Sequence, residues 1–576
     1  MLLLPSLALH LAAVAPALPA PQEDAAAIGA SLATAAPIAA PAAAPVAAPV
    51  AAPGPRLVVL LSVDQMIPEQ LTRLRPAFSG GLARLLEEGT VFTAATLDYA
   101  RTETGAGHTT LSTGCLPRSH GIVGNGFFDR EEARFQYCVE DPGAAAVTSA
   151  GRIEGQGQRS PRNLQRPTLG ELIQGQVPGS KVVSVSAKDR AAIGMGGRSD
   201  GAVLWWDKLG AGFMTSTWYA EALPGFVDRW NGSWLERAGG WDWTPALPED
   251  VAALGTAADE RPGERPFGDR GVRLPYTLGD ASSPRRLAGE VFQTPLVDLF
   301  TAEMGRLAMR EYGLGLDEQT DLLALSFSGC DVVGHAFGPY SHEVTDLLLR
   351  LDGELGALFD ELDERVGEGR WVAALSADHG VLPLPERLAV LGEPATRVSI
   401  AESGAFNARL SEALSAELGH RVRVYRRDGG LVMDRKDLDK ASVSVDAACD
   451  RLLPLAEALA AETPWVHSVH DHRAVAAMTD EARGADLLLR NTHFPGRTPD
   501  VVVLRAQGVL VPSALGTSHG SHHMYDRRVP LAFLGAGVSP ATRSDRVGTE
   551  DVVPTLLSLL GLEVPEGLDG VDLGVR

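Results

Sequence analysis

The stretch LVVLLSVD, residues 57–64, decides the fold. It is a continuous run of apolar and β-branched residues that ends in an aspartate, which is typical of a strand buried on both faces of a parallel sheet. The same arrangement recurs three times: VVSVSA leads to Lys188, LLALSFSG leads toward Asp331, and WVAALSA leads to Asp378. Polar residues therefore follow the predicted strands at one end, which is the end where ligands bind in open α/β sheets.

Helical patterns separate these strands. An alternation of strands and helices predicts an α/β fold, a three-layer sandwich around a mostly parallel sheet, with cap and peripheral insertions. VVVL at 501–504 and PLAFLGAG after Val529 are expected to add further strands. The helical patterns cover residues 82–88, 168–176, 295–312 and 344–366.

The chain is expected to divide into a leader, a linker and one large catalytic domain. Residues 1–20 are apolar and end in small residues, as a secretory signal peptide does, although no Lys or Arg precedes the apolar run. Residues 21–55 are dominated by Ala and Pro, which predicts a disordered linker. Residues 56–576 form the predicted catalytic domain, with a cap insertion near 207–285 and a peripheral insertion near 395–495. We expect a periplasmic or secreted protein with no stable membrane anchor.

Charge and cysteine content limit the partners. The chain carries 51 Lys and Arg against 73 Asp and Glu, a net charge of −22. This balance argues against a broad basic surface for nucleic acid or anionic lipid, so a phosphate site needs local positive charge, which metal ions would supply.

Four cysteines do not make a disulfide scaffold. Cys115 and Cys138 could pair in an oxidising compartment or remain free buried thiols.

Carboxylates and imidazoles recur in short clusters with metal-ligand spacing. In SGCDVVGHAFG the Asp and His are four residues apart, so both point to one face of a helix. Each cluster alone could be a helix cap, a turn or a solvated loop, but together they supply mixed oxygen and nitrogen ligands. Such sets favour zinc, with manganese or iron as alternatives, and two ions about 4 Å apart can clamp an in-line displacement. The candidate ligands are Asp64, Asp331, His335, Asp378, His379 and His519.

A threonine is the candidate nucleophile. In TETGAGHTTLSTG, Thr104 is followed by small residues that let a substrate approach the backbone, and then by a helical pattern. Coordination to a metal ion would lower the pKa of its hydroxyl, so that Thr104 would be both ligand and nucleophile. The alternatives are that Thr104 only caps the helix, or that Thr102 is the nucleophile.

Three further residues could contact the phosphoryl group. Lys188 and Arg190 in SAKDRAAI would present two cations, which favours a dianionic monoester over a diester. Asn125 in HGIVGN could donate another hydrogen bond. The alternatives are a solvated charge cluster around Asp189 and an ordinary turn at Asn125.

These motifs resemble the alkaline phosphatase superfamily, in the branch of nucleotide pyrophosphatase/phosphodiesterases and phosphate-irrepressible alkaline phosphatases. The resemblance runs from about residue 57 to the C-terminus and includes VPTLLSLLGLEVPEGLDG. The family spacing Thr-x-x-x-His, here Thr104 to His108, selects Thr104 over Thr102 as the nucleophile. The resemblance implies one zinc ion held by Asp331, His335 and His519, and a second held by Asp64, Asp378, His379 and Thr104.

At Asn125, Lys188 and Arg190 the chain is most similar to the monoesterases of that branch. The resemblance therefore implies an exported alkaline phosphatase that hydrolyses small-molecule phosphate monoesters through a phosphothreonine. One departure from the family pattern is the loop GSHHMYD, where His522 and His523 could alter access or recruit another ion.

Other functions stay open at this point. The first is a phosphodiesterase or nucleotide pyrophosphatase with the same metal site. A sulfatase is a weaker alternative, because Cys115-Leu116-Pro117-Arg118 places the arginine one position too early for the C/S-x-P-x-R motif. The last two alternative functions are a phosphate-transferring mutase and a non-catalytic phosphate-binding protein.

Overall fold

The computed structural model describes residues 54–511 and 513–576. The predicted signal peptide and linker, residues 1–20 and 21–55, lie outside the described residues except for Gly54 and Pro55. None of the helices in the described ranges is both long and apolar enough to cross a bilayer.

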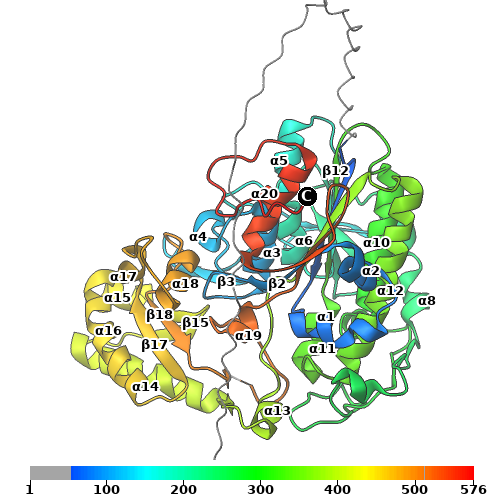
Figure 1. Cartoon of the computed structure of the whole chain (residues 1–576). Coiled ribbons are helices and arrows are strands. Elements are labelled where there is room, and N and C mark those ends of the chain that lie inside the picture. The colour runs from blue at the N-terminus through cyan, green and yellow to red at the C-terminus, as the bar shows by residue number, and fades with distance from the viewer. Residues whose placement is uncertain (1–53, 512) are drawn as a thin grey trace, which may run out of the picture. The chain divides into compact units, whose positions relative to one another are not determined.

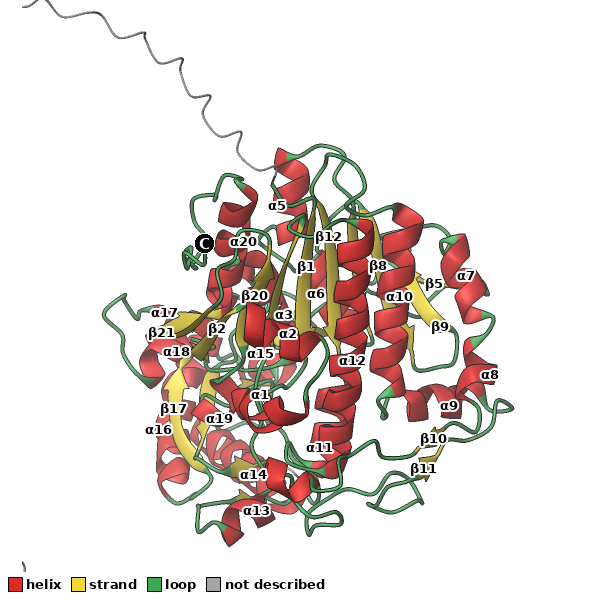
Figure 2. Cartoon of the chain, turned by 45° about the vertical axis from the view of Figure 1, so that its right-hand side comes forward, coloured by secondary structure: helices red, strands yellow, loops and turns green. Residues whose placement is uncertain are grey.

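A central sheet of eleven strands organises the domain. Its five middle strands run parallel, and their side chains are almost all buried because helices cover both faces. This arrangement confirms the predicted α/β fold (Figures 1 and 2). In spatial order the strands are β21 (Ala541–Gly548), β2 (Thr90–Thr96), β20 (Leu531–Gly535), β13 (Trp371–Ser376), β1 (Leu57–Val63), β12 (Asp321–Phe327), β7 (Val182–Ser186), β8 (Gly201–Asp207), β9 (Gly212–Ser216), β5 (Ala146–Thr148) and β6 (Gly151–Ile153).

Helices form the outer two layers. On one face α2, α10 and α12 pack together, and on the other face α3, α6 and α20 do so (Figure 2). The longest described helix, α12, begins where the Ser341 side chain accepts a hydrogen bond from the Val344 amide, which caps the helix. The bounds are α2 (Gly81–Glu88), α3 (Thr104–Thr113), α5 (Leu169–Gln176), α6 (Asp189–Gly196), α10 (Leu296–Tyr312), α11 (Gly329–Phe337), α12 (His342–Arg365) and α20 (Val552–Leu560).

A smaller sheet stands apart from the central one, in the yellow-to-orange part of Figure 1. Its strand order is β15 (Val424–Arg427), β16 (Gly430–Met433), β18 (Val501–Arg505) and β17 (Val466–Asp471), and all its pairs are antiparallel. Helices α14 (Ile400–Leu418) and α16 (Val445–Ala461) supply a separate hydrophobic cluster for it.

Both further strands expected from the sequence are present. The run at 501–504 is β18 of the smaller sheet, because its partners are Val466–Asp471 and Gly430–Met433 rather than a central strand. The run after Val529 is β20 of the central sheet, but it pairs antiparallel with both β13 and β2. Residues 212–216, within the expected cap insertion, extend the central sheet as β9.

Candidate metal centre and nucleophile

The candidate ligands meet at the carboxyl ends of three neighbouring parallel strands. Asp64 directly follows β1, and Asp378 lies two residues beyond β13. Asp331 lies in the first turn of α11, just after β12. The register pairs Val63 with Phe327, so β1 and β12 end side by side. His519 comes from a distant loop and completes the cluster.

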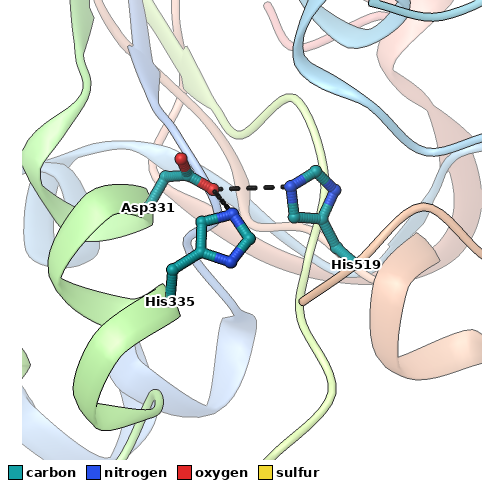
Figure 3. Close-up of side chains that lie close together, drawn as sticks. All are labelled: Asp331, His335 and His519. Atoms are coloured by element: carbon teal, nitrogen blue, oxygen red, sulfur yellow. Dashed lines mark ion pairs between the residues drawn. The ribbon is translucent and has the colours of Figure 1, made fainter. Parts of the chain in front are cut away.

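The first ligand group is Asp331, His335 and His519 (Figure 3). Both imidazoles direct Nε2 at Oδ1 of Asp331, at 3.1 Å from His335 and 3.5 Å from His519. Their Nδ1 atoms lie 2.7 Å and 2.8 Å from the carbonyl oxygens of Thr517 and Thr102. A carbonyl only accepts, so Nδ1 carries the proton and a neutral ring turns the Nε2 lone pair to the carboxylate. Two lone pairs and a carboxylate facing one point fit a divalent cation.

The second ligand group is fully buried. His379 Nε2 lies 3.2 Å from Oδ2 of Asp378 and 3.6 Å from Oδ1 of Asp64. These three atoms are buried and make no hydrogen bond to any described residue. Burial and the neighbouring carboxylate of Asp378 raise the pKa of Asp64 well above its usual value. Unpartnered buried oxygens and nitrogen are costly unless a cation binds them, so these residues also fit a metal ion.

The two groups adjoin each other. Ligand atoms of Asp64, Asp331 and His379 lie within 4.8 Å of one another. Residues of the two ligand groups are therefore close enough to contact the same ion. Ligand atoms of Asp64, His108 and Asp378 also lie within 4.8 Å of one another. His108 was expected only to mark the family spacing. Its Nδ1 lies 3.0 Å from the Thr104 carbonyl and its Nε2 2.8 Å from Ser326 Oγ. Since both nitrogens have partners, His108 is better placed to orient α3 than to bind an ion.

Lys188 lies between the two groups. Its ammonium is 2.6 Å from Oδ2 of Asp64 and also contacts Asp331. Burial would lower the pKa of Lys188, but Asp331 and Asp64 outweigh it and raise that pKa above its usual value. The structure therefore places this cation on the ligand carboxylates, whereas the sequence predicted it at phosphoryl oxygens. The carboxylates, being buried and anionic, are its strongest available partners.

Thr104 is buried at the start of α3, the helix that packs against Asp378 at Gly107. The helix cap position is Glu103, so Thr104 is not the capping residue. Its Oγ1 accepts a hydrogen bond from Arg190 Nη2 at 3.1 Å. Thr102 is the alternative nucleophile. Its hydroxyl donates a hydrogen bond to the Ser521 carbonyl at 2.9 Å and so binds the loop that carries His519.

Arg190 and Asn125 flank the nucleophile. Burial opposes the charge of Arg190, but Tyr137 and Asp189 outweigh it and raise the pKa of the guanidinium above its usual value. The Tyr137 hydroxyl accepts from Arg190 at 3.3 Å and donates to Asp189 at 2.6 Å, which fixes the guanidinium. Asn125 Oδ1 accepts from the Gly105 amide at 2.9 Å, so this side chain supports the first turn of α3.

Sequence reasoning missed Gln65. Its side-chain amide donates to Oδ1 of Asp331 at 2.6 Å, and its backbone amide donates to Oδ1 of Asp378 at 3.1 Å. Its φ of 72° lies in the left-handed region, an uncommon conformation for a residue other than glycine. A close approach also explains Gly107, where an added Cβ would lie 2.1 Å from the Asp378 carbonyl oxygen. Neither contact can be read from local sequence.

The four cysteines and the loop histidines stand outside the ligand groups. All four cysteines are free and buried. Nε2 of His523 lies 2.9 Å from the Arg505 carbonyl, and the rings of His522 and His523 are 4.0 Å apart. Among the described residues, the metal-ligand groups include neither of these histidines.

Comparison with known proteins places this geometry in a family. Residues 58–526 match the model of the type I phosphodiesterase / nucleotide pyrophosphatase family. The chain is 30% identical to the alkaline phosphatase PhoV of Synechococcus elongatus over 524 residues, which are 90% of this chain and 92% of that protein. It is 30% identical to the alkaline phosphatase PafA of Elizabethkingia meningoseptica over 531 residues, 90% of this chain and 93% of that protein.

The fold agrees with these matches. The crystal structure of wild-type PafA superimposes with a TM-score of 0.82 at 30% identity, and the match covers 91% of this chain and 99% of that chain. The chain therefore belongs to the type I phosphodiesterase / nucleotide pyrophosphatase family, and the relatives that it resembles over most of its length are alkaline phosphatases.

Proposed function

We propose that this protein is an exported alkaline phosphatase that hydrolyses small-molecule phosphate monoesters through a phosphothreonine at Thr104. The observation that carries the proposal is the placement of the buried Thr104 hydroxyl, 3.1 Å from a guanidinium nitrogen of Arg190, beside two adjoining metal-ligand groups. The alkaline phosphatase names of the matched relatives support the same activity.

Two divalent ions, which we propose to be zinc, fit the ligand groups. Asp331, His335 and His519 would hold one, and Asp64, Asp378 and His379 would hold the other together with Thr104. When bound, the ions would lower the pKa of a coordinated hydroxyl and stabilise the charge on the attacking and leaving oxygens. Burial and the neighbouring His379 hold the pKa of His519 well below its usual value, which leaves its Nε2 lone pair to bind a cation. Burial opposes the charge of His335 as well, but Asp331 outweighs it and raises the pKa of His335 instead, as an anion facing that ring does.

The chain's own residues position the phosphoryl group. Arg190, already hydrogen-bonded to Oγ1, presents a fixed cation to a non-bridging oxygen of a phosphorus atom in line with Thr104. Thr104 lies at the N-terminal end of α3, and the N-terminus of a helix favours an anion. Asn125 holds that first turn through the Gly105 amide. We propose that Lys188 supplies a second cation to the phosphoryl oxygens.

The charge of these groups favours monoesters. A monoester dianion has one more anionic oxygen than a diester, and Arg190 together with the proposed second cation, Lys188, would neutralise it. A phosphodiester carries a second ester group instead of that charge, so it gains less from the two cations. The phosphodiesterase alternative is nevertheless the one that the family description itself favours.

The test is a comparison of p-nitrophenyl phosphate with bis(p-nitrophenyl) phosphate. We expect kcat/KM for the monoester to exceed that for the diester by about a hundredfold, which is the size expected for two charge-assisted hydrogen bonds. The same purified protein and the same nitrophenol absorbance serve both substrates. A diester kcat/KM equal to or above that of the monoester would indicate that the protein is a phosphodiesterase.

The remaining alternatives have less support. A sulfatase needs its motif cysteine at the metal site, but Cys115 belongs to none of the metal-ligand groups among the described residues, and Arg118 forms an ion pair with Asp569 at 2.6 Å. A mutase and a non-catalytic binding protein have no specific contact in their favour among the described residues.

Export rests on the sequence. We propose that residues 1–20 are a cleaved signal, that residues 21–55 are a linker, and that the protein works in the periplasm or outside the cell. The catalytic domain would span 56–576, with the segment near 395–495 as a peripheral insertion. The acidic net charge of −22 supports a role on small esters rather than on nucleic acid.

A further inference from the structure

A cavity of about 330 Å³ opens beside the ligand group of His519. Its walls come from the residues before α3, from the turn between β15 and β16, and from the loop that carries His519. Glu103, which directly precedes the nucleophile Thr104, also lines it. A cavity of this size accommodates a small organic molecule. A substrate bound at Thr104 could therefore extend its leaving group into this space.

The cavity has an excess of positive charge. Five arginines and two carboxylates line it, and Arg101 binds both carboxylates, with 2.8 Å to Glu103 and 3.2 Å to Asp428. Arg426, Arg505 and Arg497 are different, because their hydrogen bonds among the described residues go to neutral oxygens. Arg426 donates to Ser403 Oγ at 2.6 Å, and Arg505 donates to the His519 carbonyl at 3.0 Å.

Two further observations show that Arg426 lacks a counter-ion. Its Nε is buried and has no hydrogen-bond partner among the described residues. Burial and the positive charge of Arg505 lower its pKa to about 10, and no carboxylate offsets them. Two guanidinium groups that line one cavity, of which Arg426 pairs with no carboxylate among the described residues, attract an anion.

The opposite wall is apolar. Val475, Leu489 and Leu504 line the cavity and are themselves 1%, 2% and 5% exposed. A ligand that fits this space therefore has a carbon skeleton and an anionic group, rather than an inorganic anion alone.

We propose that this cavity is a leaving-group subsite, in which Arg426 and Arg505 bind a second anionic group of the substrate. The preferred substrates would then be organic phosphates that carry a further phosphate or carboxylate on the alcohol side. This inference rests on the proposed monoesterase activity at Thr104. Arg426 would be a specificity residue, since it touches the distal group and not the reacting atoms.

The experiment compares fructose 1,6-bisphosphate with fructose 6-phosphate. We expect kcat/KM to favour the bisphosphate by about tenfold in the unmodified protein, the size of one charge-assisted hydrogen bond. Arg426→Gln should reduce this preference toward about twofold, which is the statistical advantage of two phosphates, while Arg505 remains in place. Arg409→Gln is the matched control, because Arg409 pairs with Glu462 on the surface of the same insertion.

A binding measurement makes the outcome independent of turnover. Calorimetric titration of the Thr104→Ala protein should show tighter binding of the bisphosphate, and the added Arg426→Gln change should remove the difference. Equal affinity and equal kcat/KM for both sugars in the protein with Arg426 intact would overturn the subsite. Loss of all ester hydrolysis with p-nitrophenyl phosphate would instead overturn the proposed function, so the two failures are distinguishable.

Discussion

Replacing Thr104 by alanine is expected to lower kcat for p-nitrophenyl phosphate by at least about a thousandfold, as loss of a covalent nucleophile does in other hydrolases. The physical reason is that Oγ1 is the buried hydroxyl that accepts a hydrogen bond from Arg190 and that we propose as the nucleophile. KM is expected to change little, because Arg190 and the α3 amides still bind the phosphoryl group. Steady-state rates and the melting temperature of each variant provide the measurement.

Two controls separate chemistry from folding. Thr104→Ser keeps a hydroxyl at the same place and should retain activity within about tenfold. Thr102→Ala removes a neighbouring buried hydroxyl that only bonds the Ser521 carbonyl, so it should keep most of the activity. If Thr102→Ala abolished turnover while Thr104→Ala stayed active, the nucleophile would have to be reassigned.

The second large effect concerns Arg190. Its replacement by alanine should lower kcat/KM for p-nitrophenyl phosphate by about a hundredfold, because one fixed cation with two donors is lost. Hydrolysis of bis(p-nitrophenyl) phosphate should fall by less than about tenfold, since a diester presents less charge to that guanidinium. The ratio of monoester to diester hydrolysis should therefore decrease in Arg190→Ala.

Arg152→Ala is the control, because Arg152 forms only an exposed ion pair with Glu154. The Arg152→Ala protein should hydrolyse p-nitrophenyl phosphate and bis(p-nitrophenyl) phosphate at unchanged rates. An Arg190→Ala protein with an unaltered rate ratio would show that this arginine does not discriminate monoesters from diesters.

The fold was largely predictable because its main signals are local. The buried runs at 57–63, 182–186, 321–327 and 371–376 are each mostly apolar, as a parallel strand covered on both faces requires. Sheet membership is not local. VVVL at 501–504 has the same composition as those runs, yet its hydrogen-bond partners lie in the smaller sheet.

The site was predictable to the same extent. Asp64, Asp331 and Asp378 follow three strands that lie side by side, so their positions in sequence indicate their positions at the sheet edge. Gln65 and the contact of Lys188 with two carboxylates depend on how distant loops meet. Long-range pairing of this kind leaves no pattern in a single sequence.

The central claim is a pair of metal ions beside a threonine nucleophile. The most direct measurement is the metal content of the purified active protein, followed by exhaustive chelation and readdition of zinc while monoester hydrolysis is recorded. We predict two zinc ions per chain, loss of activity as they are removed, and its return when they are restored. Full activity in a protein stripped of every divalent ion would contradict the account.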